Sequence, residues 1–312
     1  MRVATIDCGT NTVLLLVAEV APGQPVRAVE ERIALTRLGQ GLDRSGRLDE
    51  AAMARTLEAM QQHAARARQL GADPIAVVGT ESLRAAANSA EFLARAAALG
   101  LPVRILSAQQ EAHLAWRAVS ASLPLPAGAW RSVLDIGGGS TELIVGQGGD
   151  RSPPIWHSIP VGSVRITERY LHGDPPTEAE RRAARAAIAE AVAQLPAPRG
   201  ELCGVAGTVT TLAALHLGLR AHDSARLEGH RVPVPELAAL VQQLGTLSAA
   251  ARRELGGLDP RRADVIYAGG EILLAVCERA GASQVLISDR GVRWGALLEL
   301  ADALDPSRGS QS

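Results

Sequence analysis

The chain has 312 residues, of which 47% are hydrophobic, so it is long and apolar enough for two cores and two domains. Its 32 Lys and Arg offset 33 Asp and Glu, and a net charge of −1 gives no whole-chain signature of nucleic-acid or membrane binding. Three widely spaced cysteines fit no zinc or disulfide pattern, and no apolar run has the length of a membrane helix. We therefore expect a soluble, cytoplasmic protein with neither nucleic acid nor membrane as a partner.

A candidate phosphate-binding hairpin stands near the N-terminus. Residues 3–17 read VATIDCGTNTVLLLV, which predicts a strand that ends at Asp7, a turn of small residues and a second strand. The turn residues Gly9, Thr10 and Asn11 can bring backbone N–H groups to an anion, and Asp7 can hold a hard cation. Cys8 is either a nucleophile or, as we expect, a small side chain that fills the turn.

Residues 26–38 predict a third strand, 48–70 a long helix and 75–78 a short buried strand. The hydroxyls of Thr80 and Ser82 follow this strand and either cap the next helix or bind phosphate. Arg84, one turn later, can direct its guanidinium at phosphate oxygens.

Glu111 lies one turn into a predicted helix at 108–122, which follows a helix at 89–99 and a strand at 102–106. A glutamate in this place usually complements the helix dipole or joins a capping box, for which Ser107 and Gln110 are suitable partners. The residues alone leave a structural and a catalytic role open.

A second hairpin follows a proline-rich hinge at 123–128. Residues 133–145 read VLDIGGGSTELIV, with Asp135 at the end of a strand. Gly137, Gly138, Gly139 and Ser140 offer amides that can adopt φ > 0 and approach an anion closely. We expect Asp135 to hold Mg²⁺, and a plain glycine-rich hairpin is the alternative.

The two hairpins predict an internal repeat. We match Asp7 with Asp135 and Thr12 with Thr141, which gives the second copy one extra glycine. The period is far too long for a solenoid. It predicts two similar domains, each of which presents a phosphate-binding hairpin to a shared cleft.

Later segments continue the alternation of strand and helix. We expect a strand at 155–160, a helix at 177–195 that begins with a Thr177–Glu180 capping box, and strands at 202–206 and 284–288. Gly207 and Thr208 open a helix directly after a strand, which suits either phosphate binding or N-capping by Thr208.

IDCGTNTVLLLV and DIGGGSTELIV together resemble the exopolyphosphatase / guanosine pentaphosphate phosphohydrolase (Ppx/GppA) family of the actin, Hsp70 and sugar-kinase superfamily. Further similarity covers the segments 80–86, 105–112, 161–165, 262–271 and 288–295. The resemblance implies an α/β fold of two ribonuclease H-like (actin-like ATPase) domains with an active-site cleft between them. We place these domains at 1–124 and 125–304 and a disordered tail at 305–312. The resemblance is to the short family form, without a C-terminal HD-type metal domain.

The resemblance also implies roles for residues. Glu111 matches the family's proposed general base, and Arg84 stands in the cleft motif. The expected phosphate ligands are Gly9, Thr10, Asn11, Arg84, Gly137, Gly138, Gly139, Ser140, Gly207 and Thr208. The expected ligands of Mg²⁺ or another divalent cation are Asp135, Glu142 and Asp7. Trp294 stands where the family commonly has Glu, so we assign no charged role there.

The function implied by the resemblance is release of terminal orthophosphate from inorganic polyphosphate, with hydrolysis of the 5′-γ-phosphate of guanosine pentaphosphate (pppGpp) as the alternative. A kinase of the wider superfamily is less favoured because the connections leave little room for an acceptor-binding insert. A phosphate- or nucleotide-binding regulatory module is least favoured because Glu111, Asp135 and Glu142 are all present. A homodimer is expected from family analogy alone.

Overall fold

The computed structural model describes residues 1–21, 23–150 and 154–304. The chain divides into two compact units: Met1–Ala118 together with the segment that begins at Val292, and Val119–Gly291. One boundary therefore falls inside helix α5 (Ala108–Ser122) and the other directly before helix α13 (Val292–Leu304). This differs from the expected division at 124/125, because α13 belongs to the first unit. The predicted tail at 305–312 lies outside the described residues.

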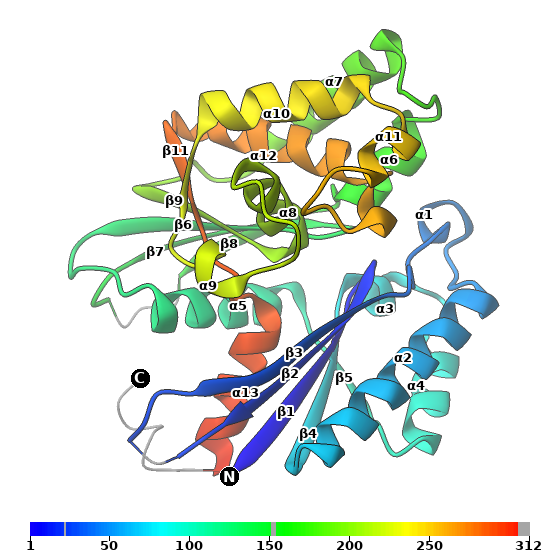
Figure 1. Ribbon diagram of the computed structural model, residues 1–312, viewed down its shortest axis with the longest axis vertical. Helices are drawn as coiled ribbons and strands as arrows, with labels where there is room; N and C mark the ends of the chain where they lie inside the picture. The colour runs from blue at the N-terminus through cyan, green and yellow to red at the C-terminus, as the bar shows by residue number, and fades with distance from the viewer. Residues whose placement is uncertain (22, 151–153, 305–312) are drawn as a thin grey trace. The chain divides into compact units, whose positions relative to one another are not determined.

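The first unit contains a five-stranded sheet in the order β3-β2-β1-β4-β5 (Figure 1). Its strands are β1 (Arg2–Cys8), β2 (Thr12–Glu19), β3 (Arg27–Leu35), β4 (Ala72–Gly79) and β5 (Val103–Ile105). The first three form an antiparallel meander, and β4 and β5 run parallel to β1. The carboxyl ends of β1, β4 and β5 therefore lie at one edge of the sheet, where loops with polar residues follow them.

Alternation along β1 and β2 gives this sheet two different faces. Ala4, Ile6 and Cys8 belong to one core cluster together with residues of α2 (Glu50–Gln69). Val3 belongs to a second cluster together with Trp294 of α13. Asp7 points to the same side as Val3, because side chains two or four positions apart share a face.

The remaining helices of the first unit are short. They are α1 (Leu42–Ser45), α3 (Glu81–Ala85) and α4 (Ser89–Ala98). Helix α2 begins at the N-cap Asp49, whose side chain accepts a hydrogen bond from the Ala52 N–H group. In Figure 1, α2 and α13 cover opposite faces of the sheet.

The second unit contains a six-stranded sheet in the order β10-β11-β9-β6-β7-β8. Its strands are β6 (Trp130–Ile136), β7 (Thr141–Gln147), β8 (Ile155–Ile159), β9 (Glu201–Val205), β10 (Arg231–Pro233) and β11 (Gln284–Ile287). Strands β6, β7 and β8 repeat the antiparallel meander, and β9 and β11 run parallel to β6 as β4 and β5 do to β1. Among the described strands of this sheet, β10 at the edge has no counterpart in the first sheet.

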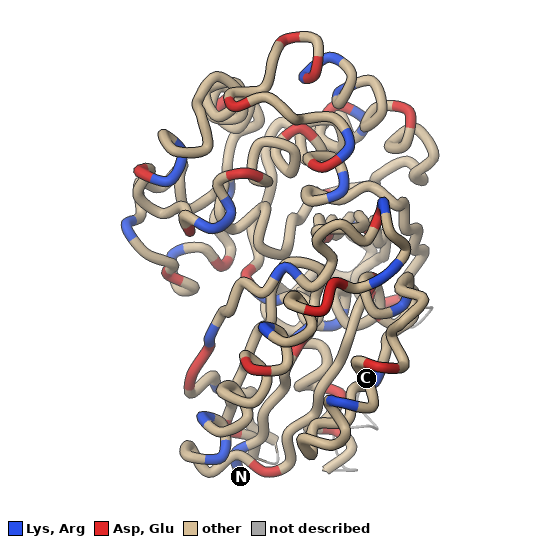
Figure 2. The backbone as a smooth tube through the Cα atoms, turned by 90° about the vertical axis from the view of Figure 1, so that its right-hand side faces the viewer, with Lys and Arg blue, Asp and Glu red and all other residues tan. Residues whose placement is uncertain are grey.

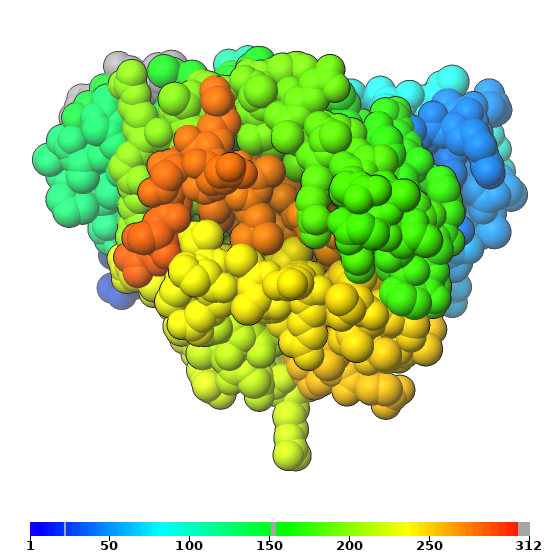
Figure 3. Space-filling view, turned by 90° about the horizontal axis from the view of Figure 1, so that it is seen from above, coloured from blue at the N-terminus to red at the C-terminus, as the bar shows by residue number. Residues whose placement is uncertain are grey.

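Most helices of the second unit cover one face of its sheet. They are α6 (Ser163–Tyr170), α7 (Glu178–Val192), α8 (Ala206–His216), α9 (Ser224–Leu227), α10 (Val234–Thr246), α11 (Ala249–Arg253) and α12 (Ile266–Ala280), with a 3₁₀ turn at Pro260–Arg262. The buried helix α12, orange in Figure 3, lies between α7 in green and α10 in yellow. The predicted Thr177–Glu180 capping box is present at the start of α7.

The shared strand order confirms the predicted class of two α/β, ribonuclease H-like domains. Helix α10 and the edge strand β10 were not among the predicted elements. Acidic and basic residues are interspersed along both units in Figure 2, in keeping with the balanced composition. In the part of the chain that the structure describes, no helix is both long and apolar enough to cross a bilayer.

Candidate active site

The turns of the two hairpins close in the same way. The Gly9 N–H donates to the Thr12 carbonyl at 2.9 Å, and the Gly137 N–H donates to the Ser140 carbonyl at 3.0 Å. Gly9 therefore corresponds to Gly137, and Thr12 corresponds to Ser140. The sequence match of Thr12 with Thr141 and the extra glycine were wrong, because the hydrogen-bond register leaves no insertion in the second turn.

The first glycine of each turn does not act as predicted. Gly9 and Gly137 do not adopt a left-handed φ, and their N–H groups are engaged within the turn. A Cβ at Gly137 would lie 3.2 Å from the Ser140 carbonyl oxygen, so the tight turn favours glycine there for space rather than for a positive φ. The N–H groups of these turns that are open to an anion are therefore the later ones, and anion binding there stays a prediction.

The start of α6 orients those later groups in the second turn. The N–H groups of Ser163 and Val164 donate to the carbonyls of Gly137 and Gly138 at 3.0 and 2.9 Å. In a trans peptide the carbonyl of one residue and the N–H of the next point in opposite directions. The N–H groups of Gly138 and Gly139 therefore point away from α6, side by side. Such consecutive amides form a concave site for an anion.

Gly162 makes this arrangement possible, and the sequence analysis missed its role. A Cβ at Gly162 would lie 2.4 Å from the carbonyl carbon and oxygen of Gly138 and 2.6 Å from the nitrogen of Gly139. Any side chain at this position would therefore displace the glycine turn. In the sequence, this segment is marked only by its similarity to the family pattern at 161–165.

Gly39 has the corresponding position in the first unit. Its N–H donates to the Thr10 carbonyl at 2.9 Å, and the N–H groups of Thr36 and Arg37 donate to the Asn11 carbonyl, each at 3.1 Å. A Cβ at Gly39 would lie 2.4 Å from Thr10 Cγ2. In both units a glycine that follows the third strand supports the turn of the hairpin. The sequence could have indicated this supporting role, because Gly39 follows β3 just as Gly162 follows β8.

The second hairpin brings two predicted metal ligands together. Asp135 and Glu142 are directly opposite each other in the β6–β7 ladder and so share one face of the sheet. Glu142 is buried, and its Oε1 accepts a hydrogen bond of 2.7 Å from the Ser158 hydroxyl. Two carboxylates held on one face are oxygen ligands of the kind that Mg²⁺ prefers.

The first hairpin has only one carboxylate at the matching place. Asp7 is opposite Leu14, where the second hairpin has Glu142. Burial raises the pKa of the Asp7 carboxyl to about 6, and the nearby Arg293 guanidinium opposes that shift. Asp7 Oδ1 is buried and has no hydrogen-bond partner among the described residues. A buried carboxylate oxygen without a donor fits a site that is completed by a cation or by water.

Arg293 is a second residue that the sequence analysis did not assign to the site. Its side chain is 8% exposed and forms an ion pair with Glu31 of β3, and its carbonyl accepts a 3.0 Å hydrogen bond from the Thr5 hydroxyl. The neighbouring Trp294 is buried in the apolar cluster between α13 and the sheet. An apolar packing role at 294 agrees with assigning no charge there.

Arg84 and Glu111 are in contact in the first unit. Arg84 Nη1 donates to the Leu106 carbonyl at 2.6 Å and forms an ion pair with the Glu111 carboxylate, whose side chain is 9% exposed. The capping box of α5 is made instead by Ser107 and Gln110, through reciprocal bonds of 3.2 and 2.9 Å. The expected capping box is therefore present without the Glu111 side chain, whose carboxylate is held by an arginine.

Two further alternatives from the sequence can be decided. Thr80 does not cap α3 with its side chain, because its hydroxyl donates to the Cys8 carbonyl at 3.4 Å. Cys8 is fully buried, and burial together with the charge of Asp7 raises the pKa of its thiol far above its usual value. A thiol that stays protonated is a filler and not a nucleophile.

The start of α8 turns sharply out of β9. Ala206 has φ 65°, a left-handed conformation that is uncommon for a residue with a Cβ. A Cβ at Gly207 would lie 2.0 Å from Nη1 of Arg262, so this guanidinium covers the first turn of the helix. Thr208 is buried at the third helical position, and the alternative of N-capping by Thr208 is wrong, since Val205 is the N-cap.

The predicted site residues therefore form two sets, one in each unit. Asp7, Gly9, Thr10, Asn11, Arg84 and Glu111 belong to the first unit. Asp135, Gly137, Gly138, Gly139, Ser140, Glu142, Gly207 and Thr208 belong to the second. Across the described ranges, no group of three His, Cys, Asp or Glu side chains is close enough to hold a metal on its own. The oxygen ligands that fit a divalent cation are Asp135 with Glu142, and Asp7.

The family model named Ppx/GppA phosphatase family matches residues 16–304 of the chain. The chain belongs to this family. Exopolyphosphatase 2 of Mycobacterium tuberculosis (strain H37Rv) is 36% identical, over 96% of this chain and 98% of the relative. A guanosine-5′-triphosphate,3′-diphosphate pyrophosphatase of Aeromonas hydrophila is 32% identical over 95% of this chain, which spans 59% of that protein.

Solved structures of the Ppx/GppA family have the same fold. The crystal structure of the Aquifex aeolicus family member matches with a TM-score of 0.82 at 31% identity and covers 98% of this chain and 99% of its own. An exopolyphosphatase from Cytophaga hutchinsonii matches with a TM-score of 0.88 at 22% identity, covering 97% of this chain and 98% of its own. The first likeness supports the family, and the second shows the fold.

Proposed function

We propose that this protein is an exopolyphosphatase, which releases orthophosphate from the end of inorganic polyphosphate by Mg²⁺-assisted attack of water. The observation that carries the proposal is the 36% identity to Exopolyphosphatase 2, which extends over almost the full length of both chains. A relative that aligns over 98% of its own length supports a shared reaction better than one of which this chain spans 59%.

Glu111 is the proposed general base. A general base must present a fixed carboxylate to the attacking water. Glu111 is almost fully buried and is held by Arg84, and the start of its helix does not require it. Arg84 donates to the Leu106 carbonyl and to Glu111 through Nη1, so we propose that the other donors of its guanidinium contact a phosphate oxygen of the substrate.

Backbone amides are the proposed anchors of the terminal phosphate. Phosphoryl transfer requires mainly positioning and neutralisation of charge. The parallel N–H groups of Gly138 and Gly139 suit this, as do those of Thr10 and Asn11 in the first unit and the Gly207–Thr208 start of α8. The reaction as proposed needs groups of both units. We therefore propose that it takes place in a cleft between them, as the family resemblance predicts.

Asp135, Glu142 and Asp7 are the proposed ligands of Mg²⁺. When bound, the cation would neutralise charge that develops on the phosphoryl oxygens. The pairing of Asp135 with Glu142 and the buried Oδ1 of Asp7 support this choice of ligands.

Hydrolysis of the 5′-γ-phosphate of pppGpp is the second candidate. The 32% identity to a guanosine-5′-triphosphate,3′-diphosphate pyrophosphatase favours it, although this chain spans only 59% of that protein. The same base, amides and cation would serve both substrates, because each reaction breaks a terminal phosphoanhydride bond.

The test compares orthophosphate release from long-chain polyphosphate, pppGpp and ATP, with and without Mg²⁺, for the native protein and Glu111→Gln. We expect Mg²⁺-dependent release from polyphosphate and a loss of about a hundredfold or more in kcat for the variant, since general-base catalysis contributes about that factor. Preference for pppGpp would retain the chemistry and change the substrate.

Ser107→Ala is the matched control. It removes the N-cap of the same helix and should lower stability by about 1 kcal/mol while leaving kcat within twofold. Release that is unaffected by Glu111→Gln would exclude Glu111 as the base. No release from any of the three substrates would refute the proposed function.

A further inference from the structure

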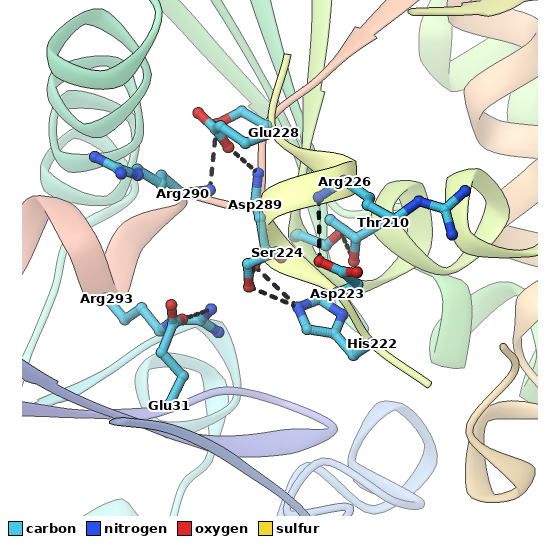
Figure 4. Close-up of polar contacts among 12 residues, drawn as sticks. Glu31, Thr210, His222, Asp223, Ser224, Arg226, Glu228, Asp289, Arg290 and Arg293 are labelled. Carbon is cyan, nitrogen blue, oxygen red and sulfur yellow. Dashed lines mark hydrogen bonds and ion pairs between the residues drawn. The ribbon is translucent and has the colours of Figure 1, made fainter. Parts of the chain in front are cut away.

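The start of helix α8 has neighbours that are distant from it in the sequence. The Ser288 N–H, at the end of β11, donates to the Gly204 carbonyl at 3.0 Å, just before α8 begins. The next residue, Asp289, accepts a hydrogen bond of 2.6 Å from the Ser224 hydroxyl (Figure 4). One neighbour of the helix start, the end of β11, is therefore tied to α9 by polar side chains.

A second neighbour, the segment 262–269, contacts both residues of α8 that we propose as phosphate ligands. A Cβ at Gly207 would lie 2.0 Å from Arg262 Nη1, so this guanidinium lies directly against Gly207. A Cβ at Gly269 would lie 2.5 Å from Thr208 Cγ2, so the first turns of α12 and α8 are in contact. A shift of the segment 262–269 would therefore displace the first turn of α8.

Hydrogen bonds within the segment give it its shape. The Arg262 N–H donates to the Asp259 carbonyl at 2.8 Å, and the Val265 N–H donates to the Arg262 carbonyl at 3.1 Å. Both bonds close local turns, so they would persist if the segment moved as a body. The carbonyl of Ala263 is different, because it accepts a hydrogen bond of 2.9 Å from Nη1 of Arg252, eleven positions earlier in the chain.

Arg252 of α11 joins three parts of the second unit. Besides the bond to Ala263, its Nε donates to the Leu244 carbonyl of α10 at 2.7 Å. Its guanidinium carbon lies 5.8 Å from the centre of the Tyr267 ring of α12. The end of α10, the segment 262–269 and the start of α12 are therefore held by one planar side chain, whose fork fixes the direction of each bond.

The burial of Arg252 is unfavourable in itself. The residue is 2% exposed, and these two hydrogen bonds go to neutral carbonyls. Its Nη2 is buried and has no hydrogen-bond partner among the described residues. Burial lowers the pKa of the guanidinium below its usual value. A buried cation that is incompletely hydrogen-bonded costs stability, and such costs are typical of positions that serve function.

We propose that Arg252 is a positioning residue that holds the segment 262–269 against the first turn of α8 and so sets the geometry of the Gly207–Thr208 phosphate site. The inference rests on the proposed function and deepens it, because it names a residue that fixes part of the binding machinery. Arg252 is buried and acts through its neighbours. Its loss should weaken phosphate binding equally in the ground state and the transition state, which raises KM and leaves kcat nearly unchanged.

Kinetics of polyphosphate hydrolysis test this with the native protein, Arg252→Met and Arg131→Met. Arg131 is the matched control, since it is 4% exposed, donates to the Leu123 carbonyl and lies at the opposite end of β6 from Asp135. Both variants are assayed at a temperature at which urea titration shows them to be folded. We expect KM to rise about tenfold in Arg252→Met and to stay within about twofold in Arg131→Met, with kcat within about threefold in both.

Hydrogen exchange of the amides provides a readout that does not depend on turnover. In Arg252→Met we expect faster exchange in peptides that cover 206–212 and 259–271, because the segment and the helix start lose their common support. Exchange in β7, at 141–147, should equal that of the native protein. In Arg131→Met the peptides 206–212 and 259–271 should exchange as in the native protein.

The outcomes separate this inference from the proposed function. An unchanged KM in Arg252→Met, or native exchange at 206–212, overturns the role of Arg252 and leaves the function intact. An equal rise of KM in Arg131→Met also overturns it, because that result indicates a general loss of structure. If Arg252→Met does not fold, Arg252→Lys is compared with Arg131→Lys by the same criteria. Absence of hydrolysis by the native protein refutes the proposed function and, with it, the phosphate role of the α8 start.

Discussion

The β1–β2 and β6–β7 hairpins have the same turn and carry different chemistry. Both turns are closed by the same hydrogen bond, and both are supported by a glycine after the third strand. The position opposite the strand-end aspartate is Leu14 in the first hairpin and Glu142 in the second. The two units therefore share a backbone turn, while a pair of facing carboxylates is found only in the second hairpin of the two.

The supports of the two turns also differ. Gly39 faces a side-chain methyl group of Thr10, whereas Gly162 faces the backbone of Gly138 and Gly139. A side chain can rotate or be shortened, and a peptide group cannot. The second turn should therefore tolerate much less change than the first.

Gly162→Ala should have the largest effect. Its Cβ would lie 2.4 Å from Gly138 backbone atoms, so the turn must move, and a displacement of this kind costs about a hundredfold in kcat/KM. Gly39→Ala should cost less and should be rescued by Thr10→Ser, which removes the opposing methyl group. Phosphate release and thermal unfolding of the three variants, with Thr10→Ser alone as the control, provide the measurement. Equal losses in both units, without rescue, would contradict the difference.

Glu142→Leu gives the second hairpin the residue type of the first. If Glu142 binds the cation, the Mg²⁺ concentration for half-maximal activity should rise about tenfold or more, a loss typical of altered metal sites. Ser158→Ala, which removes only the hydrogen bond to Glu142, should shift it in the same direction and by less. An unchanged Mg²⁺ dependence in Glu142→Leu would remove this residue from the metal site.

Asp7 should make the stability of the metal-free protein depend on pH. Its pKa is raised from 3.8 to about 6 in the folded state, so the folded protein holds this proton more tightly than the unfolded chain does. The free energy of unfolding should therefore fall as pH rises between these values, by about 3 kcal/mol at most. Asp7→Asn should abolish that fall and be the more stable protein at pH 8.

Urea unfolding in EDTA between pH 4 and pH 8 measures this dependence. A difference between wild type and Asp7→Asn that stays constant over the range would show that Asp7 is not buried in the way described. Added Mg²⁺ should reduce the difference at pH 8 if Asp7 contributes to a cation site.

Alanine at the first glycine of each turn should have the smallest effect. A Cβ at Gly9 would make only ordinary contacts of 3.4 Å or more. Gly9→Ala should therefore be neutral, or stabilise the protein by up to about 1 kcal/mol because alanine lowers the conformational entropy of the unfolded chain. The 3.2 Å contact at Gly137 should make Gly137→Ala destabilising by about 1 kcal/mol. The difference between the two free energies of unfolding tests whether the second turn is the tighter one.

Local patterns predicted much of this fold. An apolar run that ends in Asp followed by small residues marked both hairpins, and Thr177 with Glu180 marked the start of α7, because such signals depend on neighbours in the sequence. The strand register was less accessible. Thr12 was matched with Thr141 by residue type. The turn hydrogen bonds show that Thr12 corresponds to Ser140 instead.

Contacts between distant segments accounted for most of what was missed. Gly162 approaches Gly138, and Arg293 approaches Asp7 from the far end of the chain, and neither contact has a local signature. Glu111 was selected through a family pattern. Its partner Arg84 was predicted only as a phosphate ligand. The ion pair between them was not predicted because the two residues are 27 positions apart in the sequence.

The discontinuous first unit has a consequence for the order in which the protein is made. Helix α13 supplies Trp294, Leu297 and Ala301 to a cluster with Val3 and Leu16. On the ribosome, one face of the first sheet therefore emerges long before the helix that covers it is synthesised. The whole of the second unit, which is continuous in sequence, is synthesised during that interval. The part of the protein that is translated first is thus among the last to be completed.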